Sequence, residues 1–249
     1  METRKAFPED TESLGLMGKI RWRKLNQRND MIRIACDKVA SRELAKKLIG
    51  EKYILPYYVY EKNDTWKTTH PCIIKHTAAS GRNKVLPNGG ANIDIPNTWF
   101  KNIYGQYKDE WGYSQVPQRI LLEPLLQGDP DVYRFDCFHG EPRAIQIYKY
   151  KKGDVRDITT YLNPGFKLIP VKYNKRNIGS SILDNRIDEI LNISKKLCMG
   201  WDYIRVDFMV CKDGIYFSEL TPYPMSGNGV IIPVEYDTYL GGLWQYFIG

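Results

Sequence analysis

The most informative stretch of this chain is residues 203–220, which read YIRVDFMVCKDGIYFSEL. Two apolar runs on either side of the turn CKDG predict a β-hairpin. Asp207 lies on its first strand and Glu219 on its second, so the two carboxylates converge if both face the same side. Because Mg²⁺ is commonly held by one or two carboxylates together with nucleotide phosphates, we predict a magnesium site here. Pairing of these acids with neighbours such as Arg205, or capping of a strand end, is the alternative.

A second feature lies upstream, where the short strand CIIK (72–75) runs into the small-residue loop HTAASGRN (76–83) and a second strand, KVL (84–86). Small residues let backbone N–H groups approach phosphate oxygens, while the ammonium of Lys75 supplies positive charge. The pattern predicts a phosphate-binding loop, although many lysines end strands beside turns.

The remaining pattern indicates an α+β fold in which strands outnumber helices. Helices are predicted from Asn29 or Asp30 to Gly50 and over residues 181–199, where apolar residues recur at helical spacing, and over residues 96–113 despite two glycines. Strands are predicted for RILLEPLL (119–126) and for VYRFDCF (132–138) and RAIQIYKY (143–150), which form a hairpin across the turn at residues 139–142.

Composition limits the possible classes of protein. The chain has 249 residues, and its 36 Lys and Arg against 29 Asp and Glu give a formal charge of +7, which suits anionic partners. Five widely spaced cysteines without a C-x-x-C pair argue against a disulfide framework or a zinc site. The charged N-terminus and the lack of a long apolar run predict a cytoplasmic protein without a transmembrane segment.

Four segments in order resemble the ATP-binding elements of ATP-grasp enzymes: IIKHTAASG (73–81), LLEPLL (121–126), RVDFMV (205–210) and IYFSELTPYPMSG (215–227). The last segment, and IRWRKLNQRNDMIRIACDK (20–38), are similar to the TupA-like branch, which acts in teichuronopeptide and polysaccharide biosynthesis. The resemblance implies two α+β lobes with antiparallel sheets that grip a nucleotide, with a reduced N-terminal region. The implied division is an N-terminal helical segment (1–50), a small lobe (51–126) and a large lobe (127–249).

The resemblance also implies a role for each matching residue. Nucleotide contacts are expected from Lys38, Lys75, Ser80, Gly81, the hinge Glu123, Pro124, Leu125 and Leu126, and Asp131 at the ribose. Metal contacts are expected from Asp207, Glu219 and Thr221, and catalytic contacts from Arg205 and Lys75. Substrate contacts are expected from Arg134, Lys149, Arg156, Ser226 and Gly227.

Two positions depart from the family pattern. Thr221 stands where many ATP-grasp enzymes place an asparagine as the third metal ligand, although the TupA-like branch also uses threonine. The loop reads Lys75-His76-Thr77-Ala78-Ala79-Ser80-Gly81 where that branch tends to show K-x-T-H-G-S-G. The change removes the loop histidine, and His76 is expected to be a surface or hydrogen-bonded residue rather than its substitute.

The resemblance implies an ATP- and Mg²⁺-dependent ligase that joins a carboxylate to an amine through an acyl phosphate. Its substrates would be a uronic acid of a capsule or wall polysaccharide and an amino acid or amine. Two alternatives stay open. One is a kinase that phosphorylates a sugar hydroxyl, and the other is a non-catalytic module that binds nucleic acid or acidic glycan through Arg21, Arg23, Lys24 and Arg28.

Overall fold

The computed structural model of the chain describes residues 3–148, 158–174, 177–178 and 183–249, which form two compact units. Unit 1 combines Met1–Gln27 with Gly128–Gly249, and unit 2 is Arg28–Gln127. These boundaries differ from the expected ones at residues 50 and 126. The predicted N-terminal segment is divided, because its first part packs with the C-terminal half of the chain and its second part with other elements of unit 2.

Unit 1 contains the larger sheet. Its elements are β1 (Arg4–Ala6), α1 (Glu9–Glu12), α2 (Leu16–Asn26), β8 (Asp131–Phe138), β9 (Glu141–Tyr148), β10 (Ile158–Leu162), β11 (Leu168–Ile169), β12 (Lys172–Tyr173), β13 (Asn177–Ile178), α7 (Ile187–Cys198), β14 (Tyr203–Cys211), β15 (Gly214–Thr221), η3 (Pro224–Gly227), β16 (Ile231–Ile232), α8 (Val234–Leu243) and β17 (Tyr246–Ile248).

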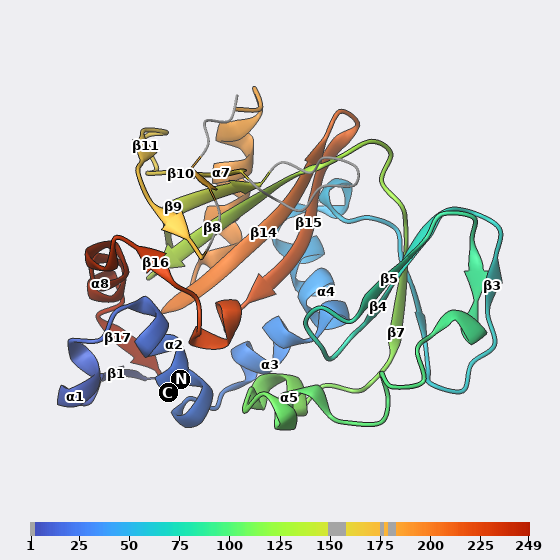
Figure 1. The fold of residues 1–249 in the computed structure, drawn as a ribbon, viewed down its shortest axis with the longest axis horizontal. Coiled ribbons are helices and arrows are strands. Elements are labelled where there is room, and N and C mark those ends of the chain that lie inside the picture. Colours follow the sequence, from blue (N-terminus) through green and yellow to red (C-terminus); the bar gives the residue numbers. More distant parts are fainter. Residues whose placement is uncertain (1–2, 149–157, 175–176, 179–182) are drawn as a thin grey trace. The chain divides into compact units, whose positions relative to one another are not determined.

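The strands of this sheet run in the order β11-β10-β9-β8-β14-β15, and β13 pairs with β10. Figure 1 shows α7 against one face of the sheet formed by β9, β8 and β14. The helix buries Ile190, Ile193 and Leu197, as its amphipathic pattern predicts. Because side chains alternate along a strand, Val206 and Phe208 of β14 point to one face of the sheet, and Arg205 and Asp207 point to the other with Arg134 and Asp136 of β8.

A β-bulge in the central hairpin decides which side chains share a face. Asp207 pairs directly with Glu219, but Phe208 pairs with Phe217, so Ser218 is the extra residue of β15. In a regular strand Phe217 and Glu219 would point to the same side. The bulge instead brings Phe217 against Phe208, with ring centroids 6.4 Å apart, while Glu219 stays on the polar face with Asp207.

Unit 2 contains a smaller sheet in the order β2-β7-β4-β5 (Figure 1). Its elements are α3 (Asp30–Cys36), α4 (Lys38–Ile49), η1 (Glu51–Tyr53), β2 (Tyr58–Tyr60), β3 (Lys67–Thr68), β4 (Cys72–His76), β5 (Asn83–Leu86), β6 (Gly90–Ala91), η2 (Asn92–Asp94), α5 (Tyr104–Tyr107), α6 (Trp111–Ser114) and β7 (Ile120–Pro124).

Two predicted helices differ from the structure. The helix expected from Asn29 to Gly50 is two helices, because Asp37 adopts an extended conformation and caps α4 by accepting from the Val39 N–H. The helix expected over residues 96–113 is reduced to the single turns α5 and α6. Asp109 between them has a positive φ of 55°, which a continuous helix does not allow.

None of the helices among the described residues has the length and apolarity needed to cross a bilayer. The described cysteines form no disulfide, and Cys211 is partly exposed while the other four are buried.

Candidate active site

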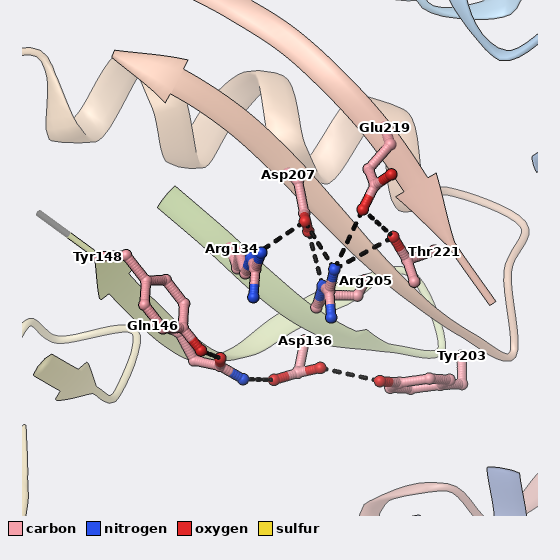
Figure 2. Close-up of polar contacts among 9 residues, drawn as sticks. All are labelled: Arg134, Asp136, Gln146, Tyr148, Tyr203, Arg205, Asp207, Glu219 and Thr221. Carbon is pink, nitrogen blue, oxygen red and sulfur yellow. Dashed lines mark hydrogen bonds and ion pairs between the residues drawn. The ribbon is translucent and has the colours of Figure 1, made fainter. Parts of the chain in front are cut away.

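Asp207 and Glu219 lie side by side on the polar face of the central hairpin, where both contact Arg205 (Figure 2). Arg205 donates from Nε and Nη2 to the two Asp207 oxygens, at 2.7 Å each. Its Nη2 also lies 3.3 Å from Glu219 Oε1 and 3.3 Å from Thr221 Oγ1. The Thr221 hydroxyl donates to Glu219 Oε1 at 2.9 Å. The predicted convergence of the two acids is therefore present, and so is the alternative pairing with Arg205.

Arg134 completes what we term the acid–arginine cluster, defined as Arg134, Arg205, Asp207, Glu219 and Thr221. Its Nε lies 3.1 Å from Asp207 Oδ2. Burial raises the pKa of Asp207, an effect that the two guanidinium groups oppose. Burial would lower the pKa of Arg205, but the Asp207 and Glu219 carboxylates outweigh it and raise that pKa above its ordinary value. Arg205 therefore keeps its positive charge in a buried position.

The donor set of this cluster fits a magnesium ion. The Asp207 side chain is only 3% exposed, whereas Glu219 is 31% exposed and reaches the surface of the hairpin. Each carboxylate oxygen can accept more than one contact, so the bonds from Arg205 do not use up the acids. No group of three His, Cys, Asp or Glu side chains gathers as a metal site in the described part of the chain. Mg²⁺ would therefore take its other ligands from water or phosphate, as it commonly does.

A second polar network lies on the same face, on the neighbouring strands (Figure 2). The buried Asp136 accepts from the Tyr203 hydroxyl at 2.8 Å and from the Gln146 amide at 2.9 Å. Tyr148 donates in turn to Gln146 at 2.7 Å. Burial raises the pKa of Asp136. Because Asp136 pairs in register with Arg205, the polar face extends from the hairpin across β8 to β9.

Unit 2 holds a cluster of opposite character, the cation cluster, defined as Lys38, Arg42, Lys75 and Glu123. Arg42 and Lys75 both contact the buried Glu123 carboxylate. Lys38, one turn before Arg42 on α4, donates to the Ala79 carbonyl of the small-residue loop. Burial would raise the pKa of Glu123, but Arg42 and Lys75 reverse the effect and hold it at about 2. Two positive side chains thus contact one ionised carboxylate, and a third lies at the loop beside them.

The small-residue loop (76–83) is held at its start by the hydrogen bonds of Thr77. Thr77 exchanges backbone and side-chain hydrogen bonds with Pro117 and Arg119, at 2.8 to 3.0 Å. Ser80 and Gly81 are exposed at the loop tip, where Gly81 has a φ of 73°. The loop therefore has a fixed start and an accessible tip, as a phosphate-binding loop requires.

His76 is buried rather than at the surface, but it is hydrogen-bonded, since its Nδ1 accepts from the Ala78 N–H at 3.2 Å. Its ring packs near Phe100, with centroids 5.3 Å apart. Burial, with help from Arg82 and Lys38, lowers the pKa of His76 to about 4. The imidazole is neutral at physiological pH and supports the loop from inside.

The order and spacing of these elements match one known family. The TupA-like ATP-grasp family model matches residues 18–245, which is most of the chain. The protein belongs to this family. Membership supports ATP-dependent carboxylate–amine ligation in general terms. No curated protein sequence matches the chain.

Solved structures that are similar to this chain include D-alanine–D-alanine ligases and the ATP-grasp ligase PsnB. D-alanine–D-alanine ligase from Helicobacter pylori is 18% identical, with a TM-score of 0.50, and the match covers 95% of this chain and 69% of that enzyme. The corresponding Bacillus anthracis enzyme is 15% identical, with a TM-score of 0.49 over 84% of this chain and 65% of that one. The ligase PsnB, solved with a precursor variant, Mg and ADP, is 14% identical, with a TM-score of 0.40 over 77% and 50%. The chain thus spans about two thirds or less of most of these relatives.

Within this ATP-grasp protein, the role of residues 123–126 as the adenine hinge stays a prediction. The Glu123 carboxylate points to Arg42 and Lys75, and the Leu125 N–H donates to the Pro71 carbonyl at 3.1 Å. Pro124 and Leu126 follow on the same segment and are at least partly exposed. Alternation along β8 places Asp131 on the opposite face from Arg134, so Asp131 does not join the acid–arginine cluster. The ribose role of Asp131 remains a prediction.

The expected substrate residues fall into three groups. Arg134 lies in the acid–arginine cluster. Ser226 and Gly227 belong to η3, a loop that follows β15 and has three consecutive positive φ angles from Met225 to Gly227. Lys149 and Arg156 lie outside the described residues.

The four basic residues considered for nucleic acid differ in burial: Arg21 and Arg28 are exposed, Lys24 is half-buried and Arg23 is buried. Arg23 is fully buried against Asp202 and Trp244, and Arg21 and Lys24 donate to Gly227 and Ser226 of η3. Arg28 lies over the Trp111 ring in unit 2. The structure thus takes Arg23 away from the surface, and the binding-module alternative otherwise stays a prediction.

Sequence reasoning missed Arg42 and Asp136. Arg42 follows Lys38 by one helical turn, which was a usable signal once Lys38 was placed at the loop. Asp136 is an acid at an alternate position of a buried strand, two residues after Arg134, and the same argument used for Asp207 would have found it.

Proposed function

We propose that the protein binds MgATP and uses it to activate a carboxylate, which it then joins to an amine. The single observation that carries this proposal is the division of charge between the two units of a TupA-like ATP-grasp chain. Unit 2 presents a surplus of positive charge beside a small-residue loop, and unit 1 presents two acids on one sheet face. A nucleotide triphosphate with its metal requires both kinds of group.

In the proposed reaction, Lys38, Lys75 and the loop backbone bind the phosphates and balance their charge. Asp207, Glu219 and Thr221 hold Mg²⁺, which when bound neutralises charge on the transferred phosphoryl group. Arg205 and Arg134 orient the acceptor carboxylate and stabilise the charge that develops on it. A carboxylate oxygen forms a bond to the γ-phosphorus as ADP leaves. The amine then attacks the acyl carbon, phosphate leaves, and the amine nitrogen loses a proton.

The substrate class proposed is a uronic acid of a surface polysaccharide or its precursor, with an amino acid or amine as second substrate. The family and the excess of positive charge over the whole chain support an acidic acceptor.

The test combines binding with product analysis. MgADP should raise the melting temperature of the protein, and failure to do so at millimolar concentration would contradict the proposal. Glucuronic and galacturonic acids labelled with ¹⁸O in the carboxyl group are then incubated with MgATP and mixed amino acids. A ligase gives an amide and transfers one ¹⁸O to inorganic phosphate. A phosphorylated sugar that persists with amines present, without ¹⁸O in phosphate, would identify a kinase instead.

A further inference from the structure

The cation cluster contains an arginine that the proposed reaction does not use. Arg42 is 2% exposed and lies on α4, one turn after Lys38, from where it donates to Glu123 and to the Lys38 carbonyl at 2.8 Å. Glu123 is 1% exposed and lies on β7, the strand next to the one that bears Lys75. One buried carboxylate is therefore shared between an arginine and the lysine expected to bind phosphate.

The two oxygens of Glu123 are divided between these partners. Arg42 directs both Nε, at 2.8 Å, and Nη2 to Oε1. Lys75 Nζ forms an ion pair with the other oxygen, Oε2. The two cations therefore do not compete for one position, and the contact made by Arg42 does not depend on Lys75.

This division matters because of what Lys75 must do when nucleotide binds. Lys75 is 12% exposed, the most exposed of the three side chains, and any movement of its ammonium towards a phosphate weakens its contact with Glu123. A buried carboxylate that loses its only counter-ion is strongly destabilised. With Arg42 in place, Glu123 keeps a guanidinium partner after Lys75 has turned away.

We propose that Arg42 is a positioning residue of the nucleotide-phosphate site. Its guanidinium balances the charge of Glu123 and fixes the position of that carboxylate, so that Lys75 is able to exchange between Glu123 and phosphate. Arg42 touches no substrate in this scheme and acts through Glu123 and Lys75. The inference rests on the proposed nucleotide binding and deepens it, because it names what determines the availability of the phosphate-binding lysine.

The experiment measures the Kd of MgADP by calorimetry for the full chain and four variants. Arg42→Met should weaken binding at least tenfold, because Lys75 becomes the only counter-ion of Glu123. Arg42→Lys keeps a charge but has a single donor group, and should fall between wild type and Arg42→Met. The double variant Arg42→Met/Glu123→Gln removes the carboxylate that retains Lys75, and should recover most of the lost affinity.

Arg33→Met is the matched control, since it removes another arginine ion pair of unit 2, to Asp30, at a position that is 40% exposed. It should leave the Kd unchanged. Melting temperatures without nucleotide report folding of each variant. If Arg42→Met does not fold, Arg42→Lys and the double variant carry the test.

Recovery of affinity by Glu123→Gln is the result that a purely structural ion pair does not predict. An unchanged Kd in Arg42→Met, or a double variant that binds as weakly as Arg42→Met while folding as well as wild type, would overturn the inference. Failure of the wild-type protein itself to bind MgADP would instead contradict the proposed function, so the two failures are distinguishable.

Discussion

The acid–arginine cluster of unit 1 and the cation cluster of unit 2 contain similar residues but differ in charge balance and in which side chain is exposed. In unit 1, two arginines face two acids on one sheet face, and one acid remains a third exposed. In unit 2, Arg42 and Lys75 contact one carboxylate that is fully buried, and Lys38 donates to the loop beside them. The first arrangement is nearly balanced and leaves oxygen ligands accessible, as a metal site requires. The second has a surplus of positive charge that suits phosphate. An arginine next to an acid therefore does not by itself identify the ligand of a site. The more exposed side chain does: a carboxylate, Glu219, in unit 1 and an ammonium, Lys75, in unit 2.

The largest expected effect comes from removing the accessible acid of unit 1. Glu219→Gln should lower ATP turnover at least about a hundredfold, because a neutral amide is a poor Mg²⁺ ligand. Its partial exposure should leave the melting temperature little changed. Asp213→Asn, in the exposed turn of the same hairpin, is the control and should keep full turnover. Normal ATP turnover in Glu219→Gln would show that Glu219 is not a metal ligand, and the acid–arginine cluster would then not be a metal site.

The next effect concerns the loop that follows the hairpin. Gly227 has a φ of 74°, and a Cβ there would lie 2.6 Å from Arg21 Cγ and 2.9 Å from the Arg21 backbone N. Gly227→Ala should therefore lower the free energy of unfolding by about 2 to 3 kcal/mol. Gly242→Ala is the control, because nothing lies within 4 Å of its Cβ position. Urea unfolding of both variants checks this, and equal stability would show that the loop is not held as described.

A smaller, pH-dependent effect tests unit 2. The pKa of His76 is about 4 in the folded protein against an ordinary 6.5, so the unfolded chain takes up the proton first on acidification. Stability from the neutral imidazole is thus complete above pH 6.5 and is lost as pH falls towards 4. Between pH 7 and 5 the loss should be about 2 kcal/mol.

Comparison with His76→Asn isolates this contribution, because asparagine can accept the Ala78 N–H bond without titrating. The urea midpoint of the variant should fall less than that of wild type between the two pH values. Parallel curves would mean that the imidazole is not held neutral by its buried, cationic surroundings.

The smallest effect is local. Asn29 caps α3 by accepting from the Ile32 N–H at 2.9 Å, so Asn29→Ala should cost about 1 kcal/mol, and Asn29→Asp should cost much less. Neither variant should change nucleotide affinity, since α4 has its own cap at Asp37. Thermal melts and MgADP titrations of both variants measure this. A loss of affinity would show that the cation cluster depends on α3.

Much of this molecule could be predicted from local pattern. The hairpins β8–β9 and β14–β15, the helix α7 and the caps at Asn29 and Gly50 depend on neighbouring residues, and each is confirmed. The single helix over 96–113 was wrong, because periodicity does not register the positive φ at Asp109 or the close packing around Gly105 and Gly112. The helix expected from 29 to 50 was wrong because Asp37, read as one residue of a helix, caps the second of two.

The sequence by itself determined the family, the strand positions of Asp207 and Glu219, and the lysine that precedes a small-residue loop, because these depend on residue type and spacing along the chain. Only the tertiary structure decided that a bulge at Ser218 keeps Glu219 beside Asp207 while Phe217 turns to the apolar face. The tertiary structure also brings Arg42 to Glu123, 81 residues later in the chain, so that Arg42 and Lys75 share the Glu123 carboxylate. Such pairings depend on which elements pack together, and spacing along the chain carries no information about contacts between distant segments.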